Sequence, residues 1–193
     1  MKIINKTKKN KRIVTQKAGF TLIETMVAVF ILAISVASLM TVVTRSLFAA
    51  KYARDEITAD YLLQEVVDYI RNDRDTTIFW QNSDWSSVFY SKYSNCATQN
   101  GCDFDVLNSI QSGVSTNIIS CSDLKGCPLY YDDSALDGSF YNHDTKYTPT
   151  NFKRKIIVTQ NVDEIKVTAT VSWMNGNLPV SRSLSTTLMK WFQ

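Results

Sequence analysis

One carboxylate, Glu24, lies inside an apolar run that extends from Phe20 to Val43. The run is long enough to cross a bilayer, because about 20 helical residues cover a hydrocarbon core of ~30 Å. A carboxylate inside such a segment is costly and by default marks a functional position whose partner carries the opposite charge. The alternative is that Glu24 lies near the membrane interface and reaches water. The position of Glu24 therefore predicts either an ion-pairing role or a solvated charge at the edge of a membrane helix.

The residues around Glu24 carry a second signal. The stretch Lys17-Ala18-Gly19-Phe20-Thr21-Leu22-Ile23-Glu24 resembles the type IV prepilin processing motif, in which Phe-Thr-Leu-x-Glu follows the cut and opens an apolar helix. The resemblance implies that a prepilin peptidase cuts after Gly19 on the cytoplasmic side and then methylates the new N-terminal amine of Phe20. It also implies that Glu24 neutralises the N-terminal amine of a neighbouring subunit. Such a pair would fix the axial register of a filament, and breaking it would leave a buried charge at a cost of ~3–5 kcal/mol.

Two features depart from the pattern of major pilins. No proline occurs before Pro128, whereas many major pilins have one about twenty residues into the mature helix, and the leader of 19 residues is long. Both features look more like minor pilins or the minor pseudopilins of type II secretion. The resemblance is specific to the motif over residues 17–45 and is only architectural beyond them.

The four cysteines form two segments of equal spacing, Cys96-x5-Cys102 and Cys121-x5-Cys127. An even number of cysteines beyond a membrane anchor indicates an oxidising compartment. Each second cysteine follows a glycine, which permits a tight reversal of the chain. Two local disulfides are the preferred pairing, although four cysteines allow three connectivities. Zinc is the rival interpretation, but the two-residue spacing usual in zinc sites is absent.

No constellation in the sequence predicts catalysis. There is one histidine, His143, and we find no nucleophile–base pairing, glycine-rich phosphate loop or metal-ligand cluster, so we predict no enzyme and no cofactor. His143 is interpreted as a surface or packing residue. A group of aspartates suggests calcium, but none has EF-hand spacing, so a solvated surface is the preferred interpretation. These aspartates are Asp103, Asp105, Asp123, Asp132, Asp133 and Asp137.

The leader holds the positive charge of the chain. The chain has 21 basic and 18 acidic residues, and removing the first 19 residues leaves 14 basic and 18 acidic ones, a net charge of about −4. Positive residues stay on the cytoplasmic side of a membrane anchor, so we expect the chain after Arg45 to lie outside. The basic pI is therefore no evidence for nucleic-acid binding by the mature domain. A minor alternative is a secretory signal with its cleavage site between Ala33 and Ser38.

The apolar run must be part of a longer helix, since no glycine or proline interrupts residues 20–75. Its outer half has an apolar stripe at helical spacing, formed by Ala59, Leu62, Leu63, Val66 and Ile70. The polar side is formed by Asp55, Glu56, Asp60, Glu65, Asp68, Arg71 and Arg74. The stripe needs a sheet to cover it. The helix end (residues 61–75) also looks weakly like that of some minor pilin-like proteins.

The rest of the chain supplies that cover. Aromatic residues after the helix are expected to pack over its end: Trp80, Trp85, Phe89, Tyr90 and Tyr93. An exposed adhesive patch is the alternative. Alternating stretches over residues 152–159, 165–173 and 180–188 predict antiparallel strands, with Asn161 and residues 175–177 as turns. Lys153, Arg154 and Lys155 form a short basic patch, for which a solvated strand edge is preferred over contact with DNA or another acidic partner.

These observations predict an α+β, pilin-like fold, with a long N-terminal transmembrane and amphipathic helix packed on a C-terminal antiparallel sheet. The expected division is a basic leader at 1–19, a transmembrane and assembly half of the helix at 20–44, and an extracytoplasmic globular domain at 45–193. The subunit is expected as a single-pass protein of the cytoplasmic (inner) membrane with its N-terminus in the cytoplasm, and then in a surface filament.

The predicted function is structural: a subunit, most like a minor pilin, of a type IV pilus-like or pseudopilus filament. The expected partners are other pilin subunits, the prepilin peptidase, the inner-membrane assembly platform and the membrane itself. The alternative is a membrane-anchored or tip-located adhesin or a DNA-binding module.

Overall fold

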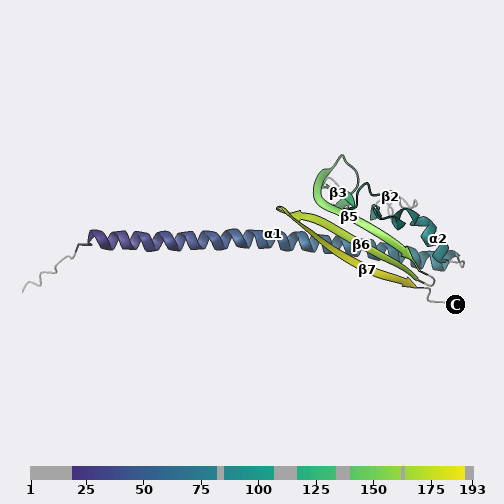
Figure 1. The fold of residues 1–193 in the computed structure, drawn as a ribbon, viewed down its shortest axis with the longest axis horizontal. Coiled ribbons are helices and arrows are strands. Elements are labelled where there is room, and N and C mark those ends of the chain that lie inside the picture. Colours follow the sequence, from purple (N-terminus) through teal and green to yellow (C-terminus); the bar gives the residue numbers. More distant parts are fainter. Residues whose placement is uncertain (1–18, 82–84, 107–116, 134–139, 162–163, 190–193) are drawn as a thin grey trace, which may run out of the picture. The chain divides into compact units, whose positions relative to one another are not determined.

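The computed structural model describes residues 19–81, 85–106, 117–133, 140–161 and 164–189 (Figure 1). The chain divides into two compact units, Met1–Phe48 and Ala49–Gln193, and helix α1 (Leu22–Gln81) contributes to both. No glycine or proline occurs in α1, so nothing in its sequence breaks the ladder of backbone hydrogen bonds. The predicted uninterrupted helix is confirmed, and it continues beyond the expected end to Gln81.

In the first unit, α1 is apolar and exposed throughout its described length. It is the one helix among the described residues that is long and apolar enough to cross a membrane, and the apolar window of that helix has no buried residue. An apolar helix surface of this size needs a bilayer or other protein surfaces around it.

The second unit pairs the outer half of α1 with a seven-stranded antiparallel sheet. Two short helices, α2 (Trp85–Lys92) and the 3-10 helix η1 (Ser94–Ala97), come before the strands. The strands are β1 (Cys102–Asp103), β2 (Ile119–Ser120), β3 (Cys127–Asp132), β4 (Phe140–Asn142), β5 (Thr148–Gln160), β6 (Glu164–Asn175) and β7 (Leu178–Met189). The predicted α+β class, with a long N-terminal helix and a C-terminal antiparallel sheet, is confirmed.

Strand β5 is the centre of the sheet. Along one edge it pairs with β6, which pairs in turn with β7, and along the other edge it pairs with β1 and β3. The β6–β7 connection is a two-residue loop, Gly176-Asn177, in which Gly176 has a φ of 61°. Positive φ at this position is typical of hairpin turns whose twist matches that of the strands. The three strands expected from the alternating residues are confirmed, and the expected turn falls on Gly176-Asn177, because Asn175 is the last paired residue of β6.

The core lies between α1 and the sheet, as the stripe on the helix predicts. Ala59, Val66 and Ile70 are fully buried, and so are Ile156 and Val167 on the covering strands. One residue of the expected polar side is not exposed. Arg74 is buried, and its guanidinium pairs with Asp75. Long arginine side chains can cover apolar surface while their charged end keeps a polar partner.

Aromatic side chains close the end of this core. Trp85, Phe89 and Tyr93 on and after α2 are buried, and the rings of Phe89 and Tyr93 lie 4.5 Å apart. The Tyr93 hydroxyl donates a hydrogen bond of 2.9 Å to Asp73 on α1, and burial raises the pKa of that hydroxyl, with Asp73 adding to the effect. The expectation that these aromatics pack over the helix end is confirmed for the three residues, and the side chain of Trp80 lies outside the described residues.

Candidate functional site

The predicted cleavage junction lies immediately before α1. Gly19 and Phe20 are exposed and non-helical, and the helix begins at Leu22. Nothing lies within 4 Å of the place where a Cβ on Gly19 would stand, and Phe20 is 78% exposed. The structure therefore places both residues in an accessible, non-helical segment directly before the helix.

Thr21 fixes the start of the helix. The backbone N–H of Glu24 donates a hydrogen bond of 3.3 Å to Thr21 Oγ1, and the N–H of Thr25 donates one of 3.2 Å to the Thr21 carbonyl. A threonine followed three residues later by glutamate is the capping-box pattern, which satisfies backbone donors that have no partner in the first turn. Glu24 is also the acidic residue of the first turn, where the helix dipole favours negative charge. The Thr-x-x-Glu spacing was visible in the sequence, and the sequence analysis did not use it.

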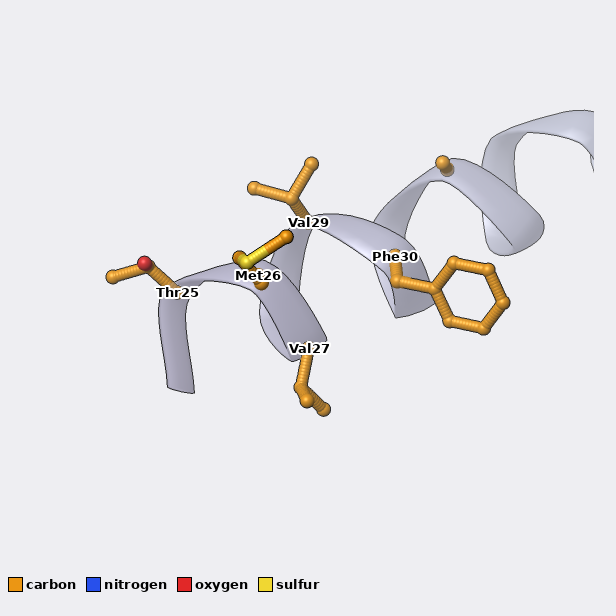
Figure 2. A pocket seen from close by; sticks show the side chains of 6 residues that line it. Thr25, Met26, Val27, Val29 and Phe30 are labelled. Carbon is orange, nitrogen blue, oxygen red and sulfur yellow. The ribbon is translucent and has the colours of Figure 1, made fainter. Parts of the chain in front are cut away.

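The surface around Glu24 is apolar and open. A shallow depression there is lined by Thr25, Met26, Val27, Val29, Phe30 and Ala33. Figure 2 shows that the side chains of Val27, Val29 and Phe30 leave the helix in different directions. Among the described residues no ion pair involves Glu24, and Met26, Val29 and Phe30 are each about two-thirds exposed. This part of the chain thus presents a carboxylate, a capped helix start and an uncovered apolar surface within about three turns.

A second group of predicted residues, the cysteines, lies in the globular unit. Cys96 is bonded to Cys102 and Cys121 to Cys127, which is the local pairing preferred from the sequence. No cysteine is free, so none is available as a thiolate ligand for zinc. Within the described ranges, no group of three or more histidine, cysteine or acidic side chains could hold a metal ion.

The glycines before the second cysteines bring the disulfide loops against β5. Gly101 has a φ of 69° and Gly126 a φ of 107°. A Cβ on Gly101 would lie 2.6 Å from the Ile156 carbonyl oxygen, and one on Gly126 would lie 2.7 Å from the Arg154 carbonyl oxygen. Both positions therefore need glycine for two reasons, the left-handed backbone and the close approach to the central strand.

The globular unit also contains a buried ionic cluster that the sequence analysis interpreted wrongly. Arg154 was expected in a solvated basic patch and Asp103 on a solvated surface, yet their side chains are 1% and 0% exposed. Arg154 Nε lies 2.8 Å and 2.9 Å from the two carboxylate oxygens of Asp103, and Arg154 Nη1 lies 3.0 Å from Glu65 Oε2. Asp132, from the same group of aspartates, is also buried, whereas Asp137 lies outside the described residues.

The reason is the alternation of β5. Phe152, Arg154, Ile156 and Val158 share the face that packs on α1, so the guanidinium must point into the core. Its remaining donors bond to the carbonyl oxygens of Leu62 and Phe104. Paired and hydrogen-bonded in this way, a buried charge is tolerated. The parity of Arg154 with its apolar neighbours was the signal that could have revealed its burial.

His143 belongs to the same cluster. Its Nδ1 lies 3.0 Å from the carbonyl oxygen of Pro128, and its Nε2 lies 3.1 Å from Asp103 Oδ2. Burial lowers the pKa of His143, but contact with Asp103 and the negative charge of Asp105 outweigh burial and the nearby Arg154, so the pKa is raised. The negative charge of Asp103 beside Nε2 therefore favours the cationic form of the ring. The interpretation of His143 as a surface or packing residue agrees with this position, since only 10% of its side chain is exposed.

Comparison with known proteins assigns a family signal to the first of these regions. Residues 15–40 match the family model of the prokaryotic N-terminal methylation motif, which is the signal of type IV pilins and pseudopilins. The matched range contains Gly19, Phe20 and Glu24, together with the capped start of α1. No curated protein and no solved structure matches the chain. The resemblance seen in the sequence is thus confirmed as a type IV pilin or pseudopilin signal.

Proposed function

We propose that this chain is a minor subunit of a type IV pilus-like or pseudopilus filament. It is made as a precursor, cut after Gly19 by a prepilin peptidase and methylated on the amine of Phe20. Other pilin subunits and an inner-membrane assembly platform are its partners. The observation that carries the proposal is the methylation motif over residues 15–40, coinciding with a helix whose apolar surface is uncovered.

Cleavage creates a positively charged amine on Phe20, close in sequence to the carboxylate of Glu24. A cut after Gly19 leaves an amine on Phe20, one residue before the Thr21 cap and four residues before Glu24. In an apolar filament core an isolated ammonium and an isolated carboxylate are each unfavourable, and pairing offsets much of that cost. Glu24 of one subunit therefore pairs with the amine of its neighbour and sets the axial register between them.

The two compact units support separate roles for the N-terminal and C-terminal parts of the chain. We assign residues 1–19 to a cytoplasmic leader, residues 20–44 to the membrane and assembly half of α1, and residues 45–193 to an extracytoplasmic domain. The basic leader stays in the cytoplasm, in line with the preference of positive residues for that side. The two disulfides suit an oxidising compartment on the other side of the membrane. The subunit is stored in the cytoplasmic membrane before it enters the filament.

The N-terminus of the mature chain tests this proposal. In cells that contain a prepilin peptidase, mass spectrometry of the full-length product should find a peptide that begins at Phe20 and carries one methyl group. Gly19→Val should abolish the cut, because the resemblance places a glycine directly before it, whereas Ala18→Val serves as the control and should leave processing intact. A chain that keeps residues 1–19, or one cut between Ala33 and Ser38, would overturn the proposal.

The minor rather than major role is tested by abundance. Sheared filaments should contain this chain as a small fraction of their subunits, and deleting it should leave a major subunit that still polymerises. If the chain dominates the filaments, it is the major subunit.

A further inference from the structure

We propose that the outer edge of strand β7 binds an extended segment of another protein, which adds to the sheet as a further strand. The part of β7 that takes this segment runs from Ser181 to Met189. The contact involves the globular unit that begins at Ala49 and goes beyond the assembly through α1 described above.

Strand β7 is a long edge of the sheet. Among the described residues it pairs with β6 and with no other strand (Figure 1). It has 12 residues, whereas the strands at the other ends of the sheet, β2 and β4, have 2 and 3. An edge strand offers a row of backbone N–H and C=O groups to any other extended chain, and proteins usually keep such strands short. The length of β7 therefore leaves a template for another strand.

Pro179 indicates which backbone groups of β7 face outward. Proline has no N–H, so within a sheet it takes a position whose N–H the neighbouring strand does not need. In an antiparallel pair such positions recur at every second residue. Residues with the parity of Pro179 therefore turn their backbone groups away from β6. These residues are Ser181, Ser183, Ser185, Thr187 and Met189.

Side-chain contacts between β6 and β7 indicate the same parity. Opposite residues whose backbones do not bond to each other bring their side chains closer together than bonded pairs do. The hydroxyl oxygens of Thr168 and Ser185 lie 3.0 Å apart, and those of Thr170 and Ser183 lie 2.9 Å apart. The backbone groups of the two serines thus point to the outer edge, and no backbone hydrogen bond from another described segment reaches them.

The features that usually prevent pairing at an edge are sparse on β7. All its residues pair with β6 in unbroken register, so no bulge twists the edge away. Arg182 is the one charged residue of the strand, and Glu56 on α1 pairs with it. All five residues with outward backbone groups are exposed. The edge is therefore accessible to another chain along most of its length.

Backbone and side chains together define the segment that fits this edge. Unpaired N–H and C=O groups at every second residue match the backbone of an extended polypeptide, which supplies both groups at the same repeat. Leu184 lies opposite the buried Ala169 and so shares the face toward α1, yet 38% of it is exposed. Side chains of adjacent strands on one face stabilise each other. The partner is therefore an extended segment with apolar residues at every second position, which cover Leu184, and polar residues between them.

The choice of another protein over a second copy rests on the proposed function, because a minor subunit meets unlike neighbours more often than its own copies. Two identical β7 edges would instead form a closed two-fold dimer.

Amide hydrogen exchange of the full-length chain in detergent tests the edge itself. We expect fast exchange at Ser181, Ser183 and Ser185, and at least roughly tenfold slower exchange at Arg182 and Leu184, whose N–H groups face β6. Slow exchange at the serines, or exchange that does not alternate, would overturn the proposal.

Photo-crosslinking in cells that assemble the filament tests the partner. A benzophenone amino acid replaces Ser185 in the full-length chain, and mass spectrometry locates the adduct. We expect adducts on another protein, within a segment whose apolar residues alternate with polar ones. An adduct on β7 of a second copy, an adduct outside such a segment, or no adduct would overturn the proposal.

Proline at position 183 separates backbone pairing from side-chain contact. Ser183→Pro removes one outward N–H but no bond to β6, and it should lower the adduct yield roughly tenfold, because the partner's carbonyl loses its donor. Ser183→Ala removes the same hydroxyl but keeps the N–H, so it is the matched control and should leave the yield unchanged. Equal yields from the two variants would contradict strand addition.

A variant that keeps every backbone N–H provides a second test, independent of how proline is tolerated. Leu184→Lys places a charge at the edge, which opposes the addition of a strand, and should also lower the yield roughly tenfold. Leu178→Lys, in the same strand but before Pro179, is the control and should have no effect. A yield that ignores Leu184→Lys would contradict the contact.

Processing at Gly19 is measured in the same cells. Unprocessed chains that still give the adduct would refute the filament function and keep the contact. Processed chains without the adduct would do the reverse.

Discussion

Two carboxylates in this chain, Glu24 and Asp103, show opposite ways of placing a negative charge in apolar surroundings. Asp103 is fully buried, and the same chain supplies its partner, Arg154, at 2.8 Å. Glu24 lies in an exposed apolar helix, and no ion pair of it is found among the described residues. The difference teaches that the buried carboxylate Asp103 is paired within its own chain, whereas the N-terminal helix carries a charge that we propose only another subunit can satisfy.

The two regions also bury apolar surface differently. Residues such as Val66 and Ile70 on the outer half of α1 are fully covered by the sheet, while Val29 and Phe30 on the inner half are about two-thirds exposed. One continuous helix therefore has an outer half that the sheet covers and an inner half whose apolar surface is uncovered. Substitutions in the covered half should change the free energy of unfolding, and substitutions in the uncovered half should change assembly instead.

The largest effect on stability is expected from Arg154→Met. Removing the guanidinium leaves Glu65 without its cation and Asp103 with His143 alone, and an incompletely compensated buried charge costs about 3–5 kcal/mol. Denaturant unfolding of the full-length chain in detergent, followed by tryptophan fluorescence, measures the loss. Lys155→Met, the next residue on the outer face, is the control and should change the free energy of unfolding by about 0.5 kcal/mol or less. Equal stability of the two variants would contradict a stabilising role for Arg154 in the buried ion pairs.

A smaller loss is expected where the disulfide loop meets β5. Gly101→Ala should lower the free energy of unfolding by about 1–3 kcal/mol, because the position has positive φ and a Cβ would meet the Ile156 carbonyl. Gly176→Ala shares the backbone conformation but has nothing within 4 Å, so its cost should stay near ~1 kcal/mol. The difference between the two variants, measured by the same unfolding experiment, isolates the close approach. If Gly176→Ala is the more damaging, the packing described for this loop is wrong.

The smallest effect is a pH dependence of the domain. The pKa of His143 is raised in the folded state, so its stabilisation is complete below about pH 6.5, the unfolded value, and is lost as pH rises through the folded pKa. Replacing His143 by Gln should therefore cost about 1 kcal/mol near pH 6, the value of an ordinary hydrogen bond, and less near pH 9. Unfolding of both chains across this range checks the trend. A cost that grows with pH would reverse the assigned sign.

The secondary structure and the apolar core could be predicted from the sequence, whereas the buried charges could not. The strands of the sheet and the stripe on α1 follow from alternation and helical spacing, which burial enforces directly. The burial of Arg154 and Asp103 could not be read from composition, because a charged residue is buried only when distant parts of the chain bring it a partner. The cap at Thr21 was readable from the sequence, since Thr-x-x-Glu is a local pattern that needs no distant partner.

That cap offers the sharpest test of the central claim, because a capping role and an ion-pairing role predict different results. Glutamine replaces glutamate in a capping box without losing the hydrogen-bonding pattern, but it carries no charge. Glu24→Gln should thus keep the helix start and the cut after Gly19 but leave the neighbour's amine without its anion. Thr21→Ala should instead weaken the cap by about 1 kcal/mol and keep the charge.

The decisive measurement is the amount of this subunit in sheared filaments, normalised to the processed chain in the membrane. The account predicts at least a roughly tenfold loss for Glu24→Gln, since ~1.4 kcal/mol already changes an equilibrium tenfold, and a much smaller loss for Thr21→Ala. Normal incorporation of the Glu24→Gln chain, or a greater loss for Thr21→Ala, would contradict it.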